Sequence, residues 1–312
     1  MIDGITSDLA MSPIKESEPT SDYLIPWYVV GVVAIICAVT LVVIAVLGPA
    51  LLGIIRYRTS QSGIWQTEAF DITDLLVLAP ILLIGGILQL AERSSSKYFL
   101  ILAPITLMTV GLEYGLGQEW SSTAYTGNVE AYSWLFLILV IGGLILLIGS
   151  LSRFTGEDAP SFKPKWLKVY VGVMAVFLLF FAVMWSSQLY EVITTGNTSG
   201  GEYLAAPTAW WVVRYFDLGI TIPVGIIALL LLLSKPKKAY PMILLFFGFF
   251  ITLGTSVNAS AILLVANRDP SVSGSGAGGL VIFPVLGILA YAGLFYLVKD
   301  KLRRARSAEI KR

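Results

Sequence analysis

The sequence predicts an all-α integral membrane protein, a polytopic bundle of about eight transmembrane helices. Of its 312 residues, 56% are hydrophobic and only 13% are charged, whereas about a quarter of the residues in a soluble domain carry charge. The mean hydropathy is +0.82. The apolar residues also occur in unbroken runs of about twenty, which is the length of a membrane-spanning helix. The strands of a membrane barrel would instead alternate over roughly ten residues.

The hydrophobic segments divide the chain into a central bundle and two polar ends. We expect an acidic tail at residues 1–22, the transmembrane bundle at residues 23–299 and a basic tail at residues 300–312. The expected helices are Tyr23–Ile55, Leu75–Ala91, Tyr98–Leu116, Tyr132–Leu151, Trp166–Tyr190, Trp210–Leu233, Tyr240–Ala266 and Leu280–Val298. The first is long enough to tilt or to kink at Pro49, and the second is the shortest.

Lysine and arginine are concentrated in every second connection between these segments. The basic residues are Arg93 and Lys97; Arg153, Lys163, Lys165 and Lys168; Lys235, Lys237 and Lys238; and Lys299, Lys301, Arg303, Arg304 and Arg306. Because basic loops stay on the cytoplasmic side, eight spans would place both termini in the cytoplasm of a cell-membrane protein. The opposite connections hold Glu119, Glu130, Glu191, Glu202 and the stretch 271–279, with Arg56 and Arg58 as exceptions.

The residue inventory restricts the chemistry. The chain contains no histidine, and its single cysteine, Cys37, lies within the first hydrophobic segment. We therefore expect no haem, metal or other cofactor held by this chain, although a lipid or quinone could lie between its helices. Phosphate-binding loops and nucleophile motifs are lacking, and the connections are short, so the sequence does not predict an enzyme. The expected partners are membrane lipid and other membrane subunits, with no indication of nucleic-acid binding.

Two similar strings each carry a pair of glycines. One is Leu-Leu-Ile-Gly-Gly-Ile-Leu at residues 82–88, and the other is Leu-Val-Ile-Gly-Gly-Leu-Ile at residues 139–145. The similarity has two interpretations. It could mark an internal duplication of adjacent helix pairs, or the glycines could simply mark places where helices pack closely.

Two charged residues interrupt the sixth hydrophobic segment. Arg214 and Asp217 are three residues apart, which places them on the same face of a helix. If the hydrocarbon begins near Trp211, Asp217 lies about 9 Å deep at 1.5 Å per residue. An ionisable residue at that depth is costly and is, by default, a candidate functional residue.

These residues belong to a longer pattern, Arg214-Tyr215-x-Asp217-x-x-x-Thr221-x-Pro223. The pattern resembles the third helix of the microbial (type 1) rhodopsins. In that family the arginine and the aspartate belong to the counter-ion and proton-acceptor cluster of the retinal Schiff base. The resemblance implies a related bundle with an arginine–carboxylate pair near its outer side.

The sequence departs from the rhodopsin pattern in three respects. Only two hydrophobic segments follow the motif helix, where the family has four. The family holds retinal on a lysine in the middle of its last helix, but the eighth segment here contains no lysine before Lys299. Leu218 also stands where the family has a tryptophan after the aspartate. We therefore expect no covalently bound retinal.

Three roles are open for Arg214 and Asp217: a structural ion pair, a proton- or ion-handling site, and a contact with a substrate. Further residues are weaker candidates for the same path. Glu113 and Glu191, with Tyr114 and Gln188, lie at the outer ends of the third and fifth segments and could line a vestibule beside Arg214, or simply lie at the membrane interface. Asn258 is the only amide in the middle of the seventh segment. Nearby, Thr252, Thr255, Ser256, Ala259 and Ser260 form a stripe that predicts close helix packing.

The candidate path residues are therefore Arg214, Asp217, Tyr215, Thr221, Glu113, Glu191 and Asn258. Three functional classes are compatible with them. The first, which the sparse charge and short loops favour, is a non-catalytic subunit of a larger, energy-transducing membrane complex. The second is a self-contained, rhodopsin-like ion or small-molecule transporter without covalent retinal. The third, a membrane enzyme acting on lipid, is the weakest because no catalytic group is evident.

Overall fold

The computed structural model describes residues 24–160, 164–270, 284–285 and 287–298. Within these residues the structure is helical and has no β-strand. In the described part of the chain, seven helical segments are long and apolar enough to cross a membrane, and a shorter apolar helix, Gly287–Val298, follows them. The predicted helical membrane bundle is therefore confirmed. The two tails and the start of the eighth predicted segment lie outside the described residues.

Several of the seven spans are built from more than one helix. The first half of the chain contains α1 (Trp27–Leu47), α2 (Gln61–Thr73), η1 (Asp74–Leu78), α3 (Ala79–Leu90), α4 (Ser96–Leu100), α5 (Pro104–Leu116), η2 (Val129–Tyr132) and α6 (Ser133–Leu151). The second half contains α7 (Pro164–Thr195), α8 (Gly201–Ala205), α9 (Pro207–Phe216), η3 (Asp217–Thr221), α10 (Ile222–Ser234) and α11 (Pro236–Ala266). The second span thus joins α2, η1 and α3, and the sixth joins α9, η3 and α10.

Two predicted boundaries are wrong. The first helix ends at Leu47, because Gly48 adopts an extended conformation and the chain then turns at Pro49. The second span begins at Gln61 rather than Leu75. Hydropathy does not identify its first part because Asp71 and Asp74 lower the local average, although each is only 3% exposed in the fold.

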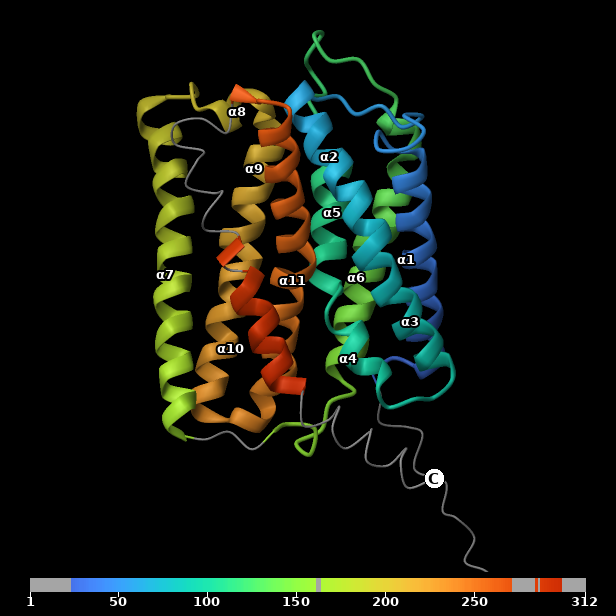
Figure 1. Cartoon of the computed structure of the whole chain (residues 1–312), viewed down its shortest axis with the longest axis vertical. Helices are drawn as coiled ribbons and strands as arrows, with labels where there is room; N and C mark the ends of the chain where they lie inside the picture. The colour runs from blue at the N-terminus through green and yellow to red at the C-terminus, as the bar shows by residue number, and fades with distance from the viewer. Residues whose placement is uncertain (1–23, 161–163, 271–283, 286, 299–312) are drawn as a thin grey trace, which may run out of the picture.

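The spans form two groups that meet in the middle of the molecule (Figure 1). In the first group, α1 packs against α3 and α6, and α5 packs against α6. In the second, α10 packs against α7 and α11, and Gly293 of the last helix lies against Phe247 of α11. Contacts of α2 with α11, and of α5 with α9 and α11, join the two groups. The third span of each group therefore packs against the second span of the other group.

The second spans of the two groups share an uncommon feature. Each contains a π-helical turn that begins at an aspartate, Asp74 in η1 and Asp217 in η3. A proline follows each aspartate by six residues, at Pro80 and Pro223. Proline has no backbone N–H and its ring crowds the preceding turn, so a widened π turn accommodates it without ending the helix.

The third spans also correspond. Both contain the string Ile-Thr-Leu-x-Thr, at residues 105–109 and 251–255. The first threonines of the two strings meet between the groups, where the hydroxyl oxygens of Thr106 and Thr252 are 2.6 Å apart and hydrogen-bonded. The second and third spans of the two halves therefore correspond, in the same order along the chain.

This match differs from the duplication of adjacent helix pairs that the glycine strings could have marked. Both strings lie in the first half, one in its second span and the other in its fourth. The match described above instead relates spans of the first half to spans of the second. The alternative interpretation of close packing is confirmed. A side chain at Gly142 would collide with the sulfur of Cys37 on α1, and one at Gly86 would press on the backbone oxygen of Gly31.

Candidate functional site

Arg214 is held inside the bundle by residues of α7 and of its own helix. Only 4% of its surface is exposed. Its Nε and Nη2 atoms donate to Oε1 of Gln188, at 3.2 and 2.7 Å. The guanidinium carbon lies 4.3 Å from the ring centres of both Trp185 and Trp210. Two aromatic faces and an amide oxygen thus stabilise a fixed positive charge in this part of the membrane.

Asp217 begins the π turn one helical turn deeper and is 7% exposed. Its Oδ2 atom accepts a hydrogen bond of 3.0 Å from Nε1 of Trp185. No ion pair within 4.0 Å joins Asp217 to Arg214, both of which lie in the described part of the chain. The two residues are instead linked through Trp185, whose ring contacts Arg214 and whose N–H contacts Asp217. Thr221, at the end of the π turn, is 1% exposed.

The opposite half of the molecule contributes Glu113. This residue lies on α5, which packs against α9. It is close enough to interact electrostatically with both Asp217 and Arg214. The site therefore combines one fixed cation and two carboxyl groups, with one of the carboxyls supplied across the interface between the halves.

The structure brings together some of the predicted path residues but not others. Arg214, Asp217, Thr221 and Glu113 lie in or beside the site, and so does Gln188. Tyr215 is 68% exposed on the outer surface of the bundle, where its ring packs near that of Trp211. Glu191 is exposed and accepts a hydrogen bond from Asn197. Asn258 lies on α11 and donates to the backbone oxygen of Gly254.

Sequence reasoning does not find two features of the buried polar groups. Trp210 is not among the candidate path residues, but it is 6% exposed and its ring lies against Arg214. The pair Asp71 and Asp74 falls in a stretch that hydropathy assigns to a loop. The spacing nevertheless contains a signal for this pair, because Asp71-x-x-Asp74-x₅-Pro80 aligns with Arg214-x-x-Asp217-x₅-Pro223.

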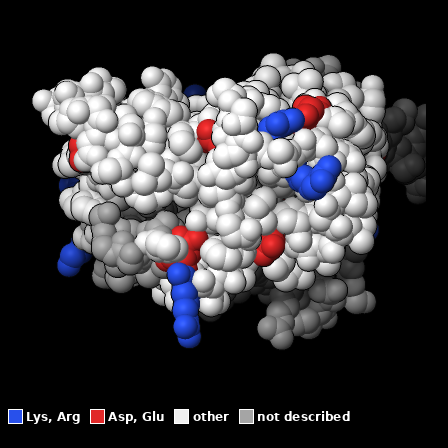
Figure 2. All heavy atoms as spheres, turned by 90° about the horizontal axis from the view of Figure 1, so that it is seen from above, with Lys and Arg blue, Asp and Glu red and all other residues white. Residues whose placement is uncertain are grey.

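Charged residues at the two ends of the bundle have local structural roles. At the end where α2 and α9 begin, charges are scattered over a mostly uncharged surface (Figure 2). Arg58 forms an ion pair of 2.6 Å with Glu130 there. The carboxylate of Glu119 also accepts hydrogen bonds from the backbone and the hydroxyl of Thr208.

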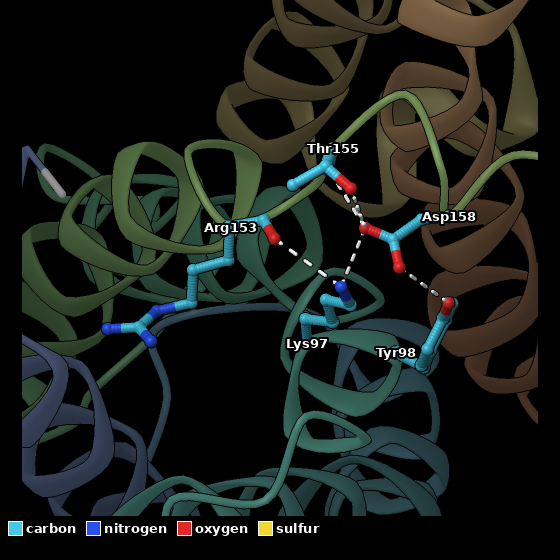
Figure 3. Close-up of polar contacts among 5 residues, drawn as sticks. All are labelled: Lys97, Tyr98, Arg153, Thr155 and Asp158. Carbon is cyan, nitrogen blue, oxygen red and sulfur yellow. Dashed lines mark hydrogen bonds and ion pairs between the residues drawn. The ribbon is translucent and has the colours of Figure 1, made fainter. Parts of the chain in front are cut away.

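At the opposite end, Asp158 anchors the loop after α6, which connects the two halves (Figure 3). Its Oδ2 atom lies 2.6 Å from Nζ of Lys97 and accepts a 2.8 Å bond from the backbone of Thr155. The hydroxyl of Tyr98 donates to Oδ1 of Asp158 at 3.4 Å. These contacts bind the loop after α6 to the start of the third span, so we assign them to stability rather than to the site.

Comparison of the chain with protein-family models, with curated proteins and with solved structures returns no match. The function is therefore inferred from the residues of this chain.

Proposed function

We propose that this protein is a self-contained membrane transporter that moves protons through the carboxyl groups of Asp217 and Glu113. The observation that carries the proposal is the burial of Asp217 beside a cation that is fixed by other residues. Charged residues are rare inside membrane proteins, where they mark ion and proton paths. A carboxyl group in such a place can bind and release a proton, while Arg214 remains charged throughout.

The arrangement of partners supports proton exchange at Asp217. Arg214 is bound by Gln188 and two indole rings, and no ion pair within 4.0 Å joins it to the carboxylate of Asp217. The fixed charge therefore stabilises the ionised form of Asp217 and leaves its carboxyl group able to bind a proton. Glu113, from the other half, provides a second carboxyl group within electrostatic range. A proton passing between the two groups would cross the interface between the halves.

The matching halves favour a transporter. Many transporters consist of two repeats related by an axis along the membrane normal, with the transported species bound where the repeats meet. Here the second and third spans of the two halves correspond, and Glu113 of the first half lies within electrostatic range of the site in the second half. The resemblance of Arg214, Asp217, Thr221 and Pro223 to the rhodopsin helix is in keeping with an ion-translocating role.

Proton flux into proteoliposomes tests the proposal. Vesicles containing the protein and a pH-sensitive dye are given a membrane potential that is negative inside. We expect their lumen to acidify faster than that of protein-free vesicles. Asp217→Asn should abolish the difference, because the amide keeps an oxygen for Trp185 but cannot bind a proton.

Tyr215→Phe is the matched control, because its side chain lies on the same helix but faces outwards. Its flux should equal that of the unmodified protein. The proposal is wrong if the protein acidifies the vesicles no faster than lipid alone, or if Asp217→Asn retains the full flux.

The second candidate function is a non-catalytic subunit of a larger membrane complex. One observation favours it. In the most apolar part of the fifth span only 17% of the residues are buried, against 67% in the seventh span. The helix of the fifth span, α7, lies at the edge of the bundle (Figure 1). A partner subunit on this surface would bury it. Purification in mild detergent distinguishes the two functions. A particle that contains several different chains favours the subunit, and a particle that contains only this chain favours the transporter.

We further propose that the protein lies in the cell membrane with its basic loops and both termini in the cytoplasm. Cysteines introduced at Ser199 and Ser307 should then react with a membrane-impermeant reagent from opposite sides. The native Cys37 is buried and should give little background. Labelling of both positions from one side would contradict this topology.

A further inference from the structure

The first half contains a second buried acidic site at the position that corresponds to Arg214 and Asp217. Asp71 and Asp74 lie one turn apart in the second span, and each is 3% exposed. Tyr57, from the loop between α1 and α2, is also 3% exposed and lies within electrostatic range of both carboxyl groups. Tyr114 of α5 closes the site, with its ring centre 5.7 Å from that of Tyr57.

The polar atoms of this site are only partly satisfied by the protein. Oδ2 of Asp71 accepts a hydrogen bond of 3.2 Å from the backbone of Ala50. Oδ1 of Asp74 and the hydroxyl of Tyr57 are buried, and neither has a hydrogen-bond partner among the described residues. A buried polar group without a partner is unfavourable, so a ligand that supplies the missing contacts of these two atoms would be favoured.

Comparison of the two halves indicates which kind of ligand is missing. A shift of 143 residues aligns Asp74 with Asp217 and Asp71 with Arg214 (217 − 74 = 214 − 71). The second half therefore supplies its own positive charge, whereas the first half has a second carboxyl group at that position. The ion pairs of the described residues do not include Asp71 or Asp74.

Among the described residues, no positively charged side chain is found to interact with the acidic pair. The titratable side chains that interact electrostatically with it are Glu68 on its own helix, Tyr57 in the preceding loop and Tyr114 on α5. From α11, Ser256 contributes a hydroxyl that is hydrogen-bonded to Thr73 at 2.6 Å. Two carboxylates cannot both be ionised in such a site without a compensating cation.

We propose that Asp71, Asp74 and the hydroxyl of Tyr57 bind a single monovalent cation, either a proton or an alkali metal ion. The cation replaces the charge that Arg214 provides in the second half. Oxygen atoms of carboxyl and hydroxyl groups suit both ligands. This site is separate from the one in the proposed function, and its occupancy can be measured without any flux.

Infrared spectroscopy of the purified protein tests the proposal. The C=O stretch of a protonated carboxyl group is recorded over a pH series, first in choline chloride and then with sodium chloride replacing choline. Subtracting the spectra of Asp74→Asn from those of the unmodified protein isolates the contribution of this site. We expect a carboxylic acid band that disappears at alkaline pH. If sodium ions also bind there, replacing choline should remove the band at a lower pH.

Three variants serve as controls. Glu92→Gln removes an exposed carboxylate at the other end of the bundle and should leave the band unchanged. Asp217→Asn should also leave it unchanged, so that failure of the proposed flux would not affect this result. Asp71→Arg copies the second half and should eliminate both the band and any sodium effect.

Should Asp71→Arg fail to fold, Asp71→Asn and Asp74→Asn still decide the question, because the amide keeps the shape of each side chain. The proposal is overturned if the spectra of both amide variants differ from the unmodified protein by ionised carboxylate bands alone, at every pH and with either salt.

Discussion

At the scale of single residues, the bundle surrounds its buried charges with partners from neighbouring spans. The burial of Arg214 and Asp217 could be predicted, because two charged residues interrupt an apolar run. Their partners could not. Trp185 and Gln188 are 32 and 26 positions away from the residues that they bind. The sequence indicates that Arg214 and Asp217 are buried, but only the packing of α7 on the sixth span shows which residues satisfy them.

The Trp185 indole provides a specific test at this scale. Trp185→Phe keeps an aromatic face for Arg214 but removes the N–H that binds Asp217. Hydrogen bonds to charged groups contribute about 1.5–3 kcal/mol, and we expect destabilisation of that order, measured as a lower midpoint of thermal unfolding in detergent. Trp134→Phe, at an indole that is 57% exposed, should change little. Equal midpoints for the two variants would contradict the assigned contact.

At the scale of elements, hydropathy locates most spans but misjudges the second. Hydropathy locates α6 directly, because no charged residue interrupts its apolar sequence. The first part of the second span contains Glu68, Asp71 and Asp74, so its composition resembles that of a loop. Its helical conformation follows from tertiary packing against α11 and α1, which a local average of hydropathy does not include.

The contact between α6 and α1 gives a prediction with a rescue. Gly142→Ala should destabilise the protein by about 1–3 kcal/mol, because the new methyl group collides with the sulfur of Cys37. Cys37→Ala removes that sulfur, so the double variant should recover most of the loss in thermal unfolding. Gly172→Ala on α7 is the control, since a methyl group added there would meet no neighbouring side chain within 4 Å. Absence of rescue would show that these helices pack differently.

At the scale of the whole molecule, the two groups of spans are joined by their second and third spans and by the loop at Asp158. The helical class and the polar stripe on the seventh span could be predicted from sequence. Thr252 and Ser256 of that stripe do pack closely, on Thr106 and Thr73. The correspondence of the halves leaves only a weak trace in the sequence, because it depends on a few residues, such as Asp74 and Asp217, spread over very different apolar sequences.

A crosslink tests how the halves meet. Thr106→Cys with Thr252→Cys should form an intramolecular disulfide under a membrane-permeant oxidant, because the native hydroxyls are 2.6 Å apart. A protease site introduced after Gly156 would cut the chain between the halves, and the fragments should then separate only after reduction. Thr109→Cys with Thr255→Cys, whose native side chains bond to other residues, should give no crosslink. The opposite pattern would exclude this arrangement.

Proton flux through the double variant Arg214→Leu/Asp217→Leu is the most direct measurement of whether the buried charges act on protons or only hold the bundle together. Removing one charge of a buried set costs about 3–5 kcal/mol, whereas replacing both with apolar residues can be nearly neutral. We therefore expect each single variant to unfold at lower temperature and the double variant to recover its stability. The proposed function predicts that this stable double variant no longer acidifies proteoliposomes. Flux equal to that of the unmodified protein would show that Arg214 and Asp217 are structural and that protons do not pass through them.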